Sequence, residues 1–221
     1  MKRMVVAIPS RNPDVQEYIR KYGFLTCPEF LDNYYVASKL YNIKYETCVR
    51  KFLRELARYH DEVIYAILID YDHDLWRTLI KMYPNITWIP PIHELDELDL
   101  ALSLDLEWIG VPYRHVAKRK FKGWKQYPFS VFEEFAEKHG VKIWILGLHE
   151  GGRDLIHRKH VFGFDTVIPV IYSTRYGKVW YSWSRAYKPE KFMRTYEILD
   201  MNLKNFKEVL EKEGIEVVKR L

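Results

Sequence analysis

The sequence has little cysteine and no long apolar run. Among its 221 residues only Cys27 and Cys48 are cysteines, which is too few for a thiolate zinc site, and their spacing matches no metal motif. We expect both to be small buried residues and not a structural disulfide. No apolar run approaches the roughly 18 residues of a membrane helix, and the first run ends at Pro9, too early for a signal peptide. These absences favour a soluble cytoplasmic protein without a membrane partner.

Several catalytic motifs are also missing. The sequence contains no G-x-G-x-x-G turn and no P-loop, which argues against dinucleotide-binding and P-loop NTPase folds. It contains no H-E-x-x-H and no G-x-S-x-G either, so the common zinc-protease and serine-hydrolase sites have no support. The chemistry must be sought elsewhere.

Aromatic residues and positive charge are plentiful. Hydrophobic residues make up 48% of the chain, with 17 Tyr, 11 Phe and 7 Trp, so the chain can bury a core and is globular. The length favours one domain over residues 1–221. A net charge of +5 indicates a polyanionic partner, and 29% charged residues would also suit a thermophile.

Apolar strand-like runs alternate with amphipathic helical patterns, which predicts parallel βαβ units. Such a chain forms either an open doubly wound sheet or a (β/α) barrel, and without nucleotide-binding glycines we favour an α/β TIM-like barrel, complete or partial. We expect strands within 4–9, 62–70, 86–92, 106–113, 141–148 and 166–173, and helices within 13–23, 45–60, 74–84, 94–105, 128–140 and 152–160.

The end of the chain departs from this alternation. Residues 178–187 form a strand-like run that we expect to pair antiparallel through the turn at 175–177. Residues 188–213 predict a long C-terminal helix with Pro189 near its first turn.

In a barrel, reactive side chains gather where the strands end, because those loops open on one face. The predicted strand ends therefore supply the candidate site residues. They are Asp70, Asp72, His73, His93, Glu94, Tyr113, Arg114, His115, His149 and Glu150.

Asp165 is different, since it precedes the apolar run 166–173 in which we expect a strand. It is either a cap that accepts hydrogen bonds from the next amides or a group positioned to react. The sequence pattern alone does not decide between the two.

A basic segment follows the predicted strand at 106–113. Phe121 and Trp124 are interleaved there with Lys118, Arg119, Lys120, Lys122 and Lys125. Cations follow phosphates and aromatic rings stack on unpaired bases, so this segment predicts a nucleic-acid contact, although a solvated loop explains the charge as well.

Two further groups of residues have chemical potential. Gly151 and Gly152 begin a predicted helix, where free amides favour an anion, although a plain turn also explains them. His93, His149 and Asp70 or Asp72 are ligand types that a divalent metal accepts. His157 and His160 lie beside Arg158 and Lys159, which is typical of a solvated face.

The segment 141–178, which includes "LGLHEGGRDL" and "FGFDTVIP", resembles the nucleophile region of the tRNA-guanine transglycosylase superfamily. In that family a strand ending in Met-Gly-Val-Gly leads into a Pro-Glu-Asp-Leu helix and then into Phe-Asp-Cys-Val-x-Pro-Thr-Arg. The resemblance implies that Asp165 attacks the anomeric carbon of ribose.

Upstream strand ends are similar to the family in order and spacing over about residues 60 to 178. The resemblance implies that Asp70 or Asp72 reads the base, and that His93 replaces a base-reading glutamine. It implies substrate contacts from Gly110, Val111, Gly147 and His149, with nucleic acid held by the basic segment and Arg175.

The sequence also departs from the family. Its Asp-Ser-Gly-Gly-Phe motif has no counterpart, although Asp32 lies in the corresponding region, and no cysteine zinc motif follows Asp165. The chain resembles a minimal member, nearer the 7-deazaguanine DNA transglycosylases of phages and genomic islands.

We therefore expect a base-exchange enzyme, a pentosyltransferase that displaces guanine by a carboxylate nucleophile without cofactor or metal. Its partners would be tRNA or DNA and a guanine or 7-deazaguanine base, and the sequence leaves open an oligomer or partner subunit. The alternatives are a metal-dependent barrel hydrolase using His93, His149 and Asp70, and a non-catalytic nucleic-acid-binding barrel.

Overall fold

The larger of two parallel sheets contains both the first and the last strand of the chain. The computed structural model describes residues 1–33, 35 and 42–221. The sheet has the strand order β10-β1-β7-β6-β5. Its strands are β1 (Lys2–Ala7), β5 (Trp108–Pro112), β6 (Lys142–Leu146), β7 (Val161–Asp165) and β10 (Ile215–Val218).

The smaller parallel sheet has the order β2-β3-β4, with β2 (Phe30–Leu31), β3 (Tyr65–Ile67) and β4 (Thr87–Ile89). Single parallel bridges join it to the larger sheet, Ala7 to Leu25 on one side and Pro91 to Gly110 on the other. The strands therefore follow one another around a ring that lacks continuous ladders at two places. The predicted TIM-like (β/α) barrel is confirmed in this incomplete form.

The last strand fills the first of these two places. β10 pairs with the beginning of β1, from Lys2 to Val5, whereas Leu25 bonds to the end of the same edge. Beyond β10, Lys219 Nζ lies 2.7 Å from Glu29 Oε1, so the C-terminal residues contact the segment that enters β2. β10 thus acts as a wedge between β1 and β2.

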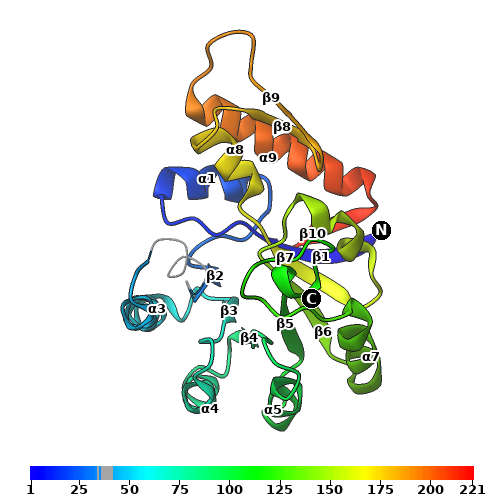
Figure 1. The fold of residues 1–221 in the computed structure, drawn as a ribbon. Helices are drawn as coiled ribbons and strands as arrows, with labels where there is room; N and C mark the ends of the chain where they lie inside the picture. The colour runs from blue at the N-terminus through cyan, green and yellow to red at the C-terminus, as the bar shows by residue number, and fades with distance from the viewer. Residues whose placement is uncertain (34, 36–41) are drawn as a thin grey trace.

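Helices surround the ring, as Figure 1 shows, with α8, α9 and the β8–β9 hairpin together on one side. A helix lies in each connection between successive parallel strands, as parallel crossovers usually require. The helices are α1 (Pro13–Lys21), α3 (Tyr45–Tyr59), α4 (His73–Met82), α5 (Glu97–Ser103), α6 (Tyr113–Val116), α7 (Phe129–His139), the 3-10 helix η1 (Glu150–His157), α8 (Ile168–Thr174) and α9 (Thr195–Lys212), and the hairpin consists of β8 (Val179–Ser182) and β9 (Arg185–Tyr187).

The prediction of a strand at 166–173 is wrong. The strand lies earlier, at Val161–Asp165, and the apolar run that follows it forms α8, with Pro169 in the first turn. The run is apolar because α8 packs against α9 and β8 and buries Ile168 and Pro169. Asp165 consequently ends its strand, in the position where the other candidate residues lie.

Three other boundaries need correction. The C-terminal helix begins at Thr195 and not at 188, and residues 188–194 form neither helix nor strand. Residues 178–187 fold back on themselves as the antiparallel β8–β9 hairpin, so the turn at 175–177 does not pair them with a preceding strand. The helix expected at 152–160 is the 3-10 helix η1.

The barrel interior is filled mainly by large aromatic side chains. Phe30 stacks on Trp144 with ring centroids 5.3 Å apart, and Tyr65 and Trp108 complete the cluster. The Trp144 ring occupies the space beside Gly163, where an added Cβ would come within 2.3 Å of a ring carbon. A residue without a side chain at 163 is therefore a packing requirement.

We expect Gly163→Ala to lower the free energy of unfolding by about 1–3 kcal/mol, because its methyl group would overpack the barrel interior. Urea unfolding measures the change. In a Trp144→Phe background the same substitution should cost less, since the clashing ring is smaller. Equal costs in both backgrounds would contradict this packing argument.

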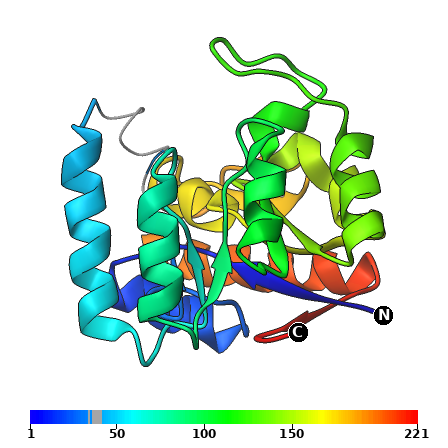
Figure 2. The same cartoon turned by 90° about the horizontal axis from the view of Figure 1, so that it is seen from below.

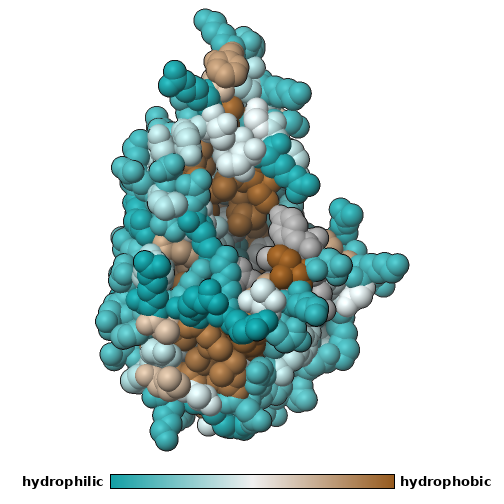
Figure 3. Space-filling model, turned by 90° about the vertical axis from the view of Figure 1, so that its left-hand side faces the viewer, coloured by the Kyte–Doolittle hydropathy of each residue, from teal (hydrophilic) through white to brown (hydrophobic). Residues whose placement is uncertain are grey.

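Both cysteines are buried and free, as the sequence predicts. Figure 3 shows the side that bears α1 and α3, with two apolar patches set in a mainly polar surface. Among the described residues, no helix has the length and apolar character needed to cross a membrane.

Candidate active site

Four polar residues follow four different strands at the carboxyl end of the barrel. Asp32 follows β2, Asp70 follows β3, His93 follows β4, and Asp165 is the last residue of β7. Parallel strands present these ends on one rim. The predicted meeting of Asp70 and His93 at this rim is confirmed, because their side chains are hydrogen-bonded.

Asp165 is held by one donor on each carboxylate oxygen. The indole nitrogen of Trp144 lies 3.0 Å from Oδ1, and the backbone nitrogen of Gly147 lies 3.0 Å from Oδ2. Gly147 has a φ of 64°, a left-handed conformation that glycine adopts without strain. The two donors fix the orientation of the carboxylate and leave further lone pairs for a substrate.

Asp32 lies electrostatically between two other aspartates, because its charge affects Asp165 and the charge of Asp70 affects it. Burial raises the pKa of Asp165 to about 7, and the nearby charge of Asp32 adds to the increase. Burial likewise raises the pKa of Asp32 to about 6, with Arg11 opposing the increase and Asp70 adding to it. Asp32 thus couples to both other carboxyls, and two of the acids titrate close to neutral pH.

The raised pKa of Asp165 predicts how the stability of the protein depends on pH. Between its ordinary pKa of 3.8 and its folded pKa of about 7, Asp165 binds more protons when folded than when unfolded. Its contribution to stability is therefore complete below 3.8 and is lost as pH rises towards 7, at up to about 1.4 kcal/mol per pKa unit, reduced by partial exposure.

We accordingly expect the stability difference between the unsubstituted protein and Asp165→Asn to change across this window. Urea unfolding from pH 4 to pH 8 measures it. The unsubstituted protein should lose stability relative to the variant as pH rises. A difference that stays constant over the range would contradict the raised pKa of Asp165.

Asp70 is enclosed, and both of its oxygens have protein partners. Oδ1 is hydrogen-bonded to His93 Nε2. Oδ2 accepts from Asn33 Nδ2 at 2.6 Å and from the Tyr45 hydroxyl at 3.3 Å. Only 3% of Asp70 is exposed, and burial raises its pKa despite the His93 hydrogen bond. It is therefore built into the wall of the site.

A chain of hydrogen bonds runs inward from the basic segment and determines where the hydrogens lie. His115 Nδ1 is 2.8 Å from the Lys125 carbonyl oxygen, which can only accept, so this nitrogen carries a hydrogen. Burial lowers the pKa of His115 and favours its neutral form. Its Nε2 then accepts from His93 Nδ1 at 3.2 Å. One hydrogen remains to be shared between His93 Nε2 and Asp70.

Aromatic rings cover this buried pair. The Tyr71 ring stacks on His93 with centroids 4.7 Å apart and an angle of 22° between the planes. Tyr71 is 55% exposed and has a φ of 59°, which side-chain-bearing residues rarely adopt. Trp124 lies 5.0 Å from the His115 ring and 6.0 Å from that of His93. The site therefore presents aromatic surface to incoming molecules.

The basic segment projects from the mouth of the barrel. Figure 2 shows this loop (green) extending beyond the helices, at the end opposite the two chain termini. Lys118 and Lys125 pair with Asp154 and Glu94. Arg119, Lys120 and Lys122 are exposed, and none of them is ion-paired to a described residue. Three cations at the mouth thus remain available for phosphates.

The predicted substrate contacts differ in their surroundings. Asp72 is exposed and caps α4 by accepting from Leu75 N at 3.1 Å, and it lines a pocket together with Asp70 and Tyr71. Gly110 and Val111 are buried within β5. The Gly110 amide and carbonyl bond to Pro90 and Ile92, so its backbone is part of the link to β4 and is not open to a base.

Four other predicted residues have the following surroundings. Gly147 is exposed, and its backbone nitrogen donates to Asp165. Gly152 is required by packing, because an added Cβ would lie 2.4 Å from Leu148 and 2.9 Å from Tyr113. His149 is exposed at the start of η1, and Arg175 is exposed at the end of α8.

A metal site has no geometric support in the described part of the chain. His93 directs one ring nitrogen to Asp70 and the other to His115. Within residues 1–33, 35 and 42–221, no three His, Cys, Asp or Glu side chains form a group that could hold a metal ion. Burial raises the pKa of Cys27 to about 11, so this thiol stays protonated.

The sequence did not indicate roles for Asn33, Tyr45 or Trp144, and it identified Asp32 only by its position in the region of the family's Asp-Ser-Gly-Gly-Phe motif. Asp32 follows a strand of only two residues, too short to leave a hydrophobic pattern. Trp144 reads as an ordinary core residue, and only the structure shows its indole nitrogen directed at Asp165.

Comparisons with known proteins place the fold and nothing finer. No protein-family model matches the chain, and no curated protein sequence does either. A crystal structure of a putative fructose-1,6-biphosphate aldolase from Coccidioides immitis aligns with a TM-score of 0.54 at 11% identity, covering 95% of this chain and 89% of that one. Thiamine phosphate pyrophosphorylase from Pyrococcus furiosus aligns with a TM-score of 0.48 at 12% identity, covering 94% and 96%.

Proposed function

We propose that this (β/α)-barrel protein exchanges a nucleobase in a nucleic acid, displacing guanine through a covalent intermediate on Asp165. The observation that carries the proposal is the Asp165 carboxylate itself. It ends β7, it is oriented by Trp144 and Gly147, and it is coupled to a second acid, Asp32. A retaining glycosyl transfer needs this combination of nucleophile and acid.

In the first step, an oxygen of Asp165 would bond to C1′ of the target nucleotide while the bond from C1′ to the base nitrogen breaks. The leaving base takes the electron pair and needs a proton. The pKa values of Asp165 and Asp32 are both raised towards neutral pH, so a proton can lie on either carboxyl group there. Asp32 is our candidate for the acid that delivers it.

The second step reverses the first. The incoming base bonds to C1′, the ester to Asp165 breaks, and Asp32 takes the proton that the incoming base loses. No atom remains on the protein, so the cycle is complete. The raised pKa of Asp32, about 6, suits a group that must give and take a proton near neutral pH.

The mouth of the barrel supplies binding surface for such a substrate. A flipped base needs a stacking surface, which Tyr71 and Trp124 offer above His93. Phosphates need cations, which Arg119, Lys120 and Lys122 offer. Asp70 and His93 remain our predicted base-reading groups. They would contact the base while hydrogen-bonded to each other in the wall of the site.

The test is incorporation of radiolabelled guanine into acid-insoluble nucleic acid, with bulk tRNA in one arm and duplex DNA in another. Exchange in either arm supports the proposal and identifies the substrate. Denaturing electrophoresis should also detect a protein-linked nucleic acid when the incoming base is withheld. The absence of label and adduct from both arms would refute it.

The alternatives give different results in the same assay. A non-catalytic nucleic-acid-binding barrel would bind both polymers and exchange nothing, and this binding would fail when Arg119, Lys120 and Lys122 are neutralised. A metal-dependent hydrolase would release a hydrolysis product, and EDTA would abolish this release.

A further inference from the structure

A second basic and aromatic surface lies away from the barrel mouth, on the β8–β9 hairpin and its flanking residues 175–194. The segment contains six cationic side chains and a single acidic one, Glu190, and so carries a net charge of +5. This equals the net charge of the whole chain, which means that the rest of the protein is balanced. The cations are Arg175, Lys178, Arg185, Lys188, Lys191 and Arg194.

These cations are not neutralised by neighbouring carboxylates. None of the six is ion-paired to a described residue, although some cations elsewhere on the surface are, such as Lys21 with Asp200 at 2.7 Å. Unpaired positive charges repel one another, so their concentration on one segment costs stability unless an anion is bound there.

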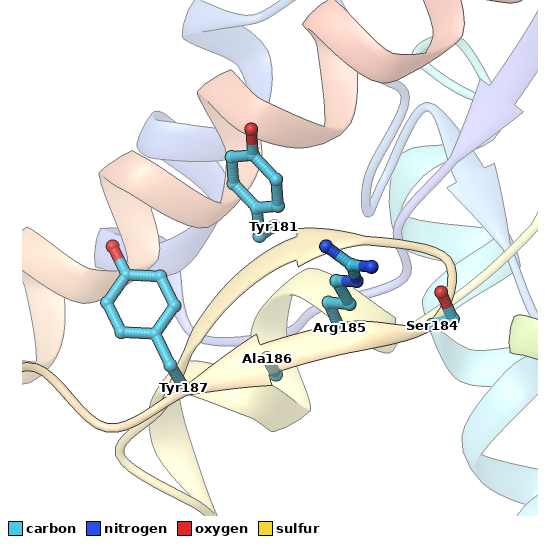
Figure 4. Close-up of a pocket in the computed structure, with 5 residues that line it drawn as sticks. All are labelled: Tyr181, Ser184, Arg185, Ala186 and Tyr187. Atoms are coloured by element: carbon cyan, nitrogen blue, oxygen red, sulfur yellow. The ribbon is translucent and has the colours of Figure 1, made fainter.

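Exposed aromatic rings are interleaved with the charges. Tyr181 is 60% exposed, Tyr187 51%, Tyr176 49% and Phe192 95%. Tyr181, Arg185 and Tyr187 line a groove of about 530 Å³ together with Ser184 and Ala186. Figure 4 shows these two tyrosines and the arginine projecting from the same side of the hairpin.

Folding does not require these rings, because the hairpin is anchored by other residues. Trp180 is fully buried and packs on Phe206 of α9 at 5.4 Å between ring centroids. Its backbone nitrogen donates to Asn202 Oδ1 at 2.7 Å, and its carbonyl accepts from Asn205 at 2.8 Å. α9 therefore holds the hairpin as a fixed platform whose outer tyrosines make no contribution to the core.

We propose that this hairpin surface binds single-stranded nucleic acid, with bases stacked on Tyr181 and Tyr187 and phosphates contacted by Arg185, Lys188 and Lys191. Stacking rings among unpaired cations are the combination by which proteins hold single strands without reading their sequence. The inference rests on the proposed function only in that the substrate is a nucleic acid. The surface would hold the strand that flanks the target nucleotide.

A second copy of this chain is the competing occupant, since exposed rings also occur at protein interfaces. If two copies met through this surface, each would contribute a net charge of +5, and the repulsion would disfavour self-association. The charge is complementary to a polyanion.

The experiment measures binding of a fluorescein-labelled 20-nucleotide oligo(dT) by anisotropy over a range of KCl concentrations. Tyr181→Ala with Tyr187→Ala should weaken binding by about ten-fold or more. Arg185→Gln with Lys188→Gln and Lys191→Gln should make the negative slope of log affinity against log salt shallower by about 2, because three phosphate contacts are lost. The matched control is Lys81→Gln with Lys138→Gln, exposed cations on α4 and α7, which should change neither the affinity nor the slope.

Unchanged oligo(dT) binding in both hairpin variants would overturn the inference. So would sedimentation showing that the aromatic variant converts a dimer to a monomer without loss of oligo(dT) binding, because the surface would then join two copies. The result is separable from base exchange. If the unsubstituted protein binds oligo(dT) through the hairpin but exchanges no base, only the proposed function is refuted. If it exchanges the base but neither hairpin variant loses oligo(dT) binding, only this inference is refuted.

Discussion

Asp165→Asn should reduce base exchange by about 10⁴-fold or more and abolish the covalent adduct, because an amide cannot form the glycosyl ester. The variant keeps the size and shape of the side chain, so the rim should stay folded. Trp144 and Gly147 both donate to the carboxylate, and an amide offers only one oxygen, so one hydrogen bond is lost at about 1 kcal/mol. The measurement is single-turnover exchange with saturating nucleic acid, accompanied by thermal unfolding.

Trp144→Phe is the companion variant that tests positioning. It keeps an aromatic ring, removes the donor to Oδ1 and leaves space beside Gly163, and we expect about a ten-fold loss. The same donor favours the ionised form of Asp165, and its removal should therefore raise the pH at which activity reaches half its maximum. Retained exchange in Asp165→Asn would remove the basis of the proposed function. A fall in Trp144→Phe without a shifted pH profile would reduce Trp144 to a packing residue.

Asp70→Ala should lower the free energy of unfolding by about 3–5 kcal/mol, because it leaves buried His93, Asn33 and Tyr45 without their common partner. In a chain of this size that loss corresponds to a melting temperature lower by about 10 °C. Asp70 is only 3% exposed and makes contacts with all three side chains. Thermal and urea unfolding measure the change.

Asp70→Asn is the matched control, and its outcome follows from the hydrogen-bond chain that starts at Lys125. With His115 neutral, His93 carries its hydrogen on Nδ1. The side-chain amide of the introduced asparagine could then donate to His93 Nε2 as a protonated Asp70 would, and its oxygen would still accept from Asn33. We expect a loss of less than about 1 kcal/mol. If both variants lost the same stability, the pair would require the ionised aspartate, and this assignment of hydrogens would be wrong.

Much of the fold was predictable, because the parallel strands are covered on both faces and leave continuous apolar runs. The errors lie where that relation fails. Residues 166–173 are as apolar as a strand because α8 packs against α9 and β8 and buries Ile168 and Pro169. β2 and β10 went unpredicted since one has two residues and the other, Ile215–Val218, is partly exposed at a sheet edge.

The site was predictable only at the level of strand ends. Asp70 and His93 were expected at one rim and do meet there. Their enclosure was not foreseeable, because Asn33 and Tyr45 reach Asp70 from segments distant in sequence. Gly110 shows the opposite problem, since a glycine that seems suited to touching a base is explained by the close approach of Ile89, Leu146 and Pro90.

The contact between Gly163 and Trp144 also restricts how this protein can change over evolutionary time. A side chain at 163 requires a smaller ring at 144, and a ring other than tryptophan removes the indole donor from Asp165. Descendants that keep an acid at 165 with its donor must therefore keep both residues. Lineages that change the pair together should also be those in which Asp165 has been lost, so covariation among positions 144, 163 and 165 would mark where the chemistry was abandoned.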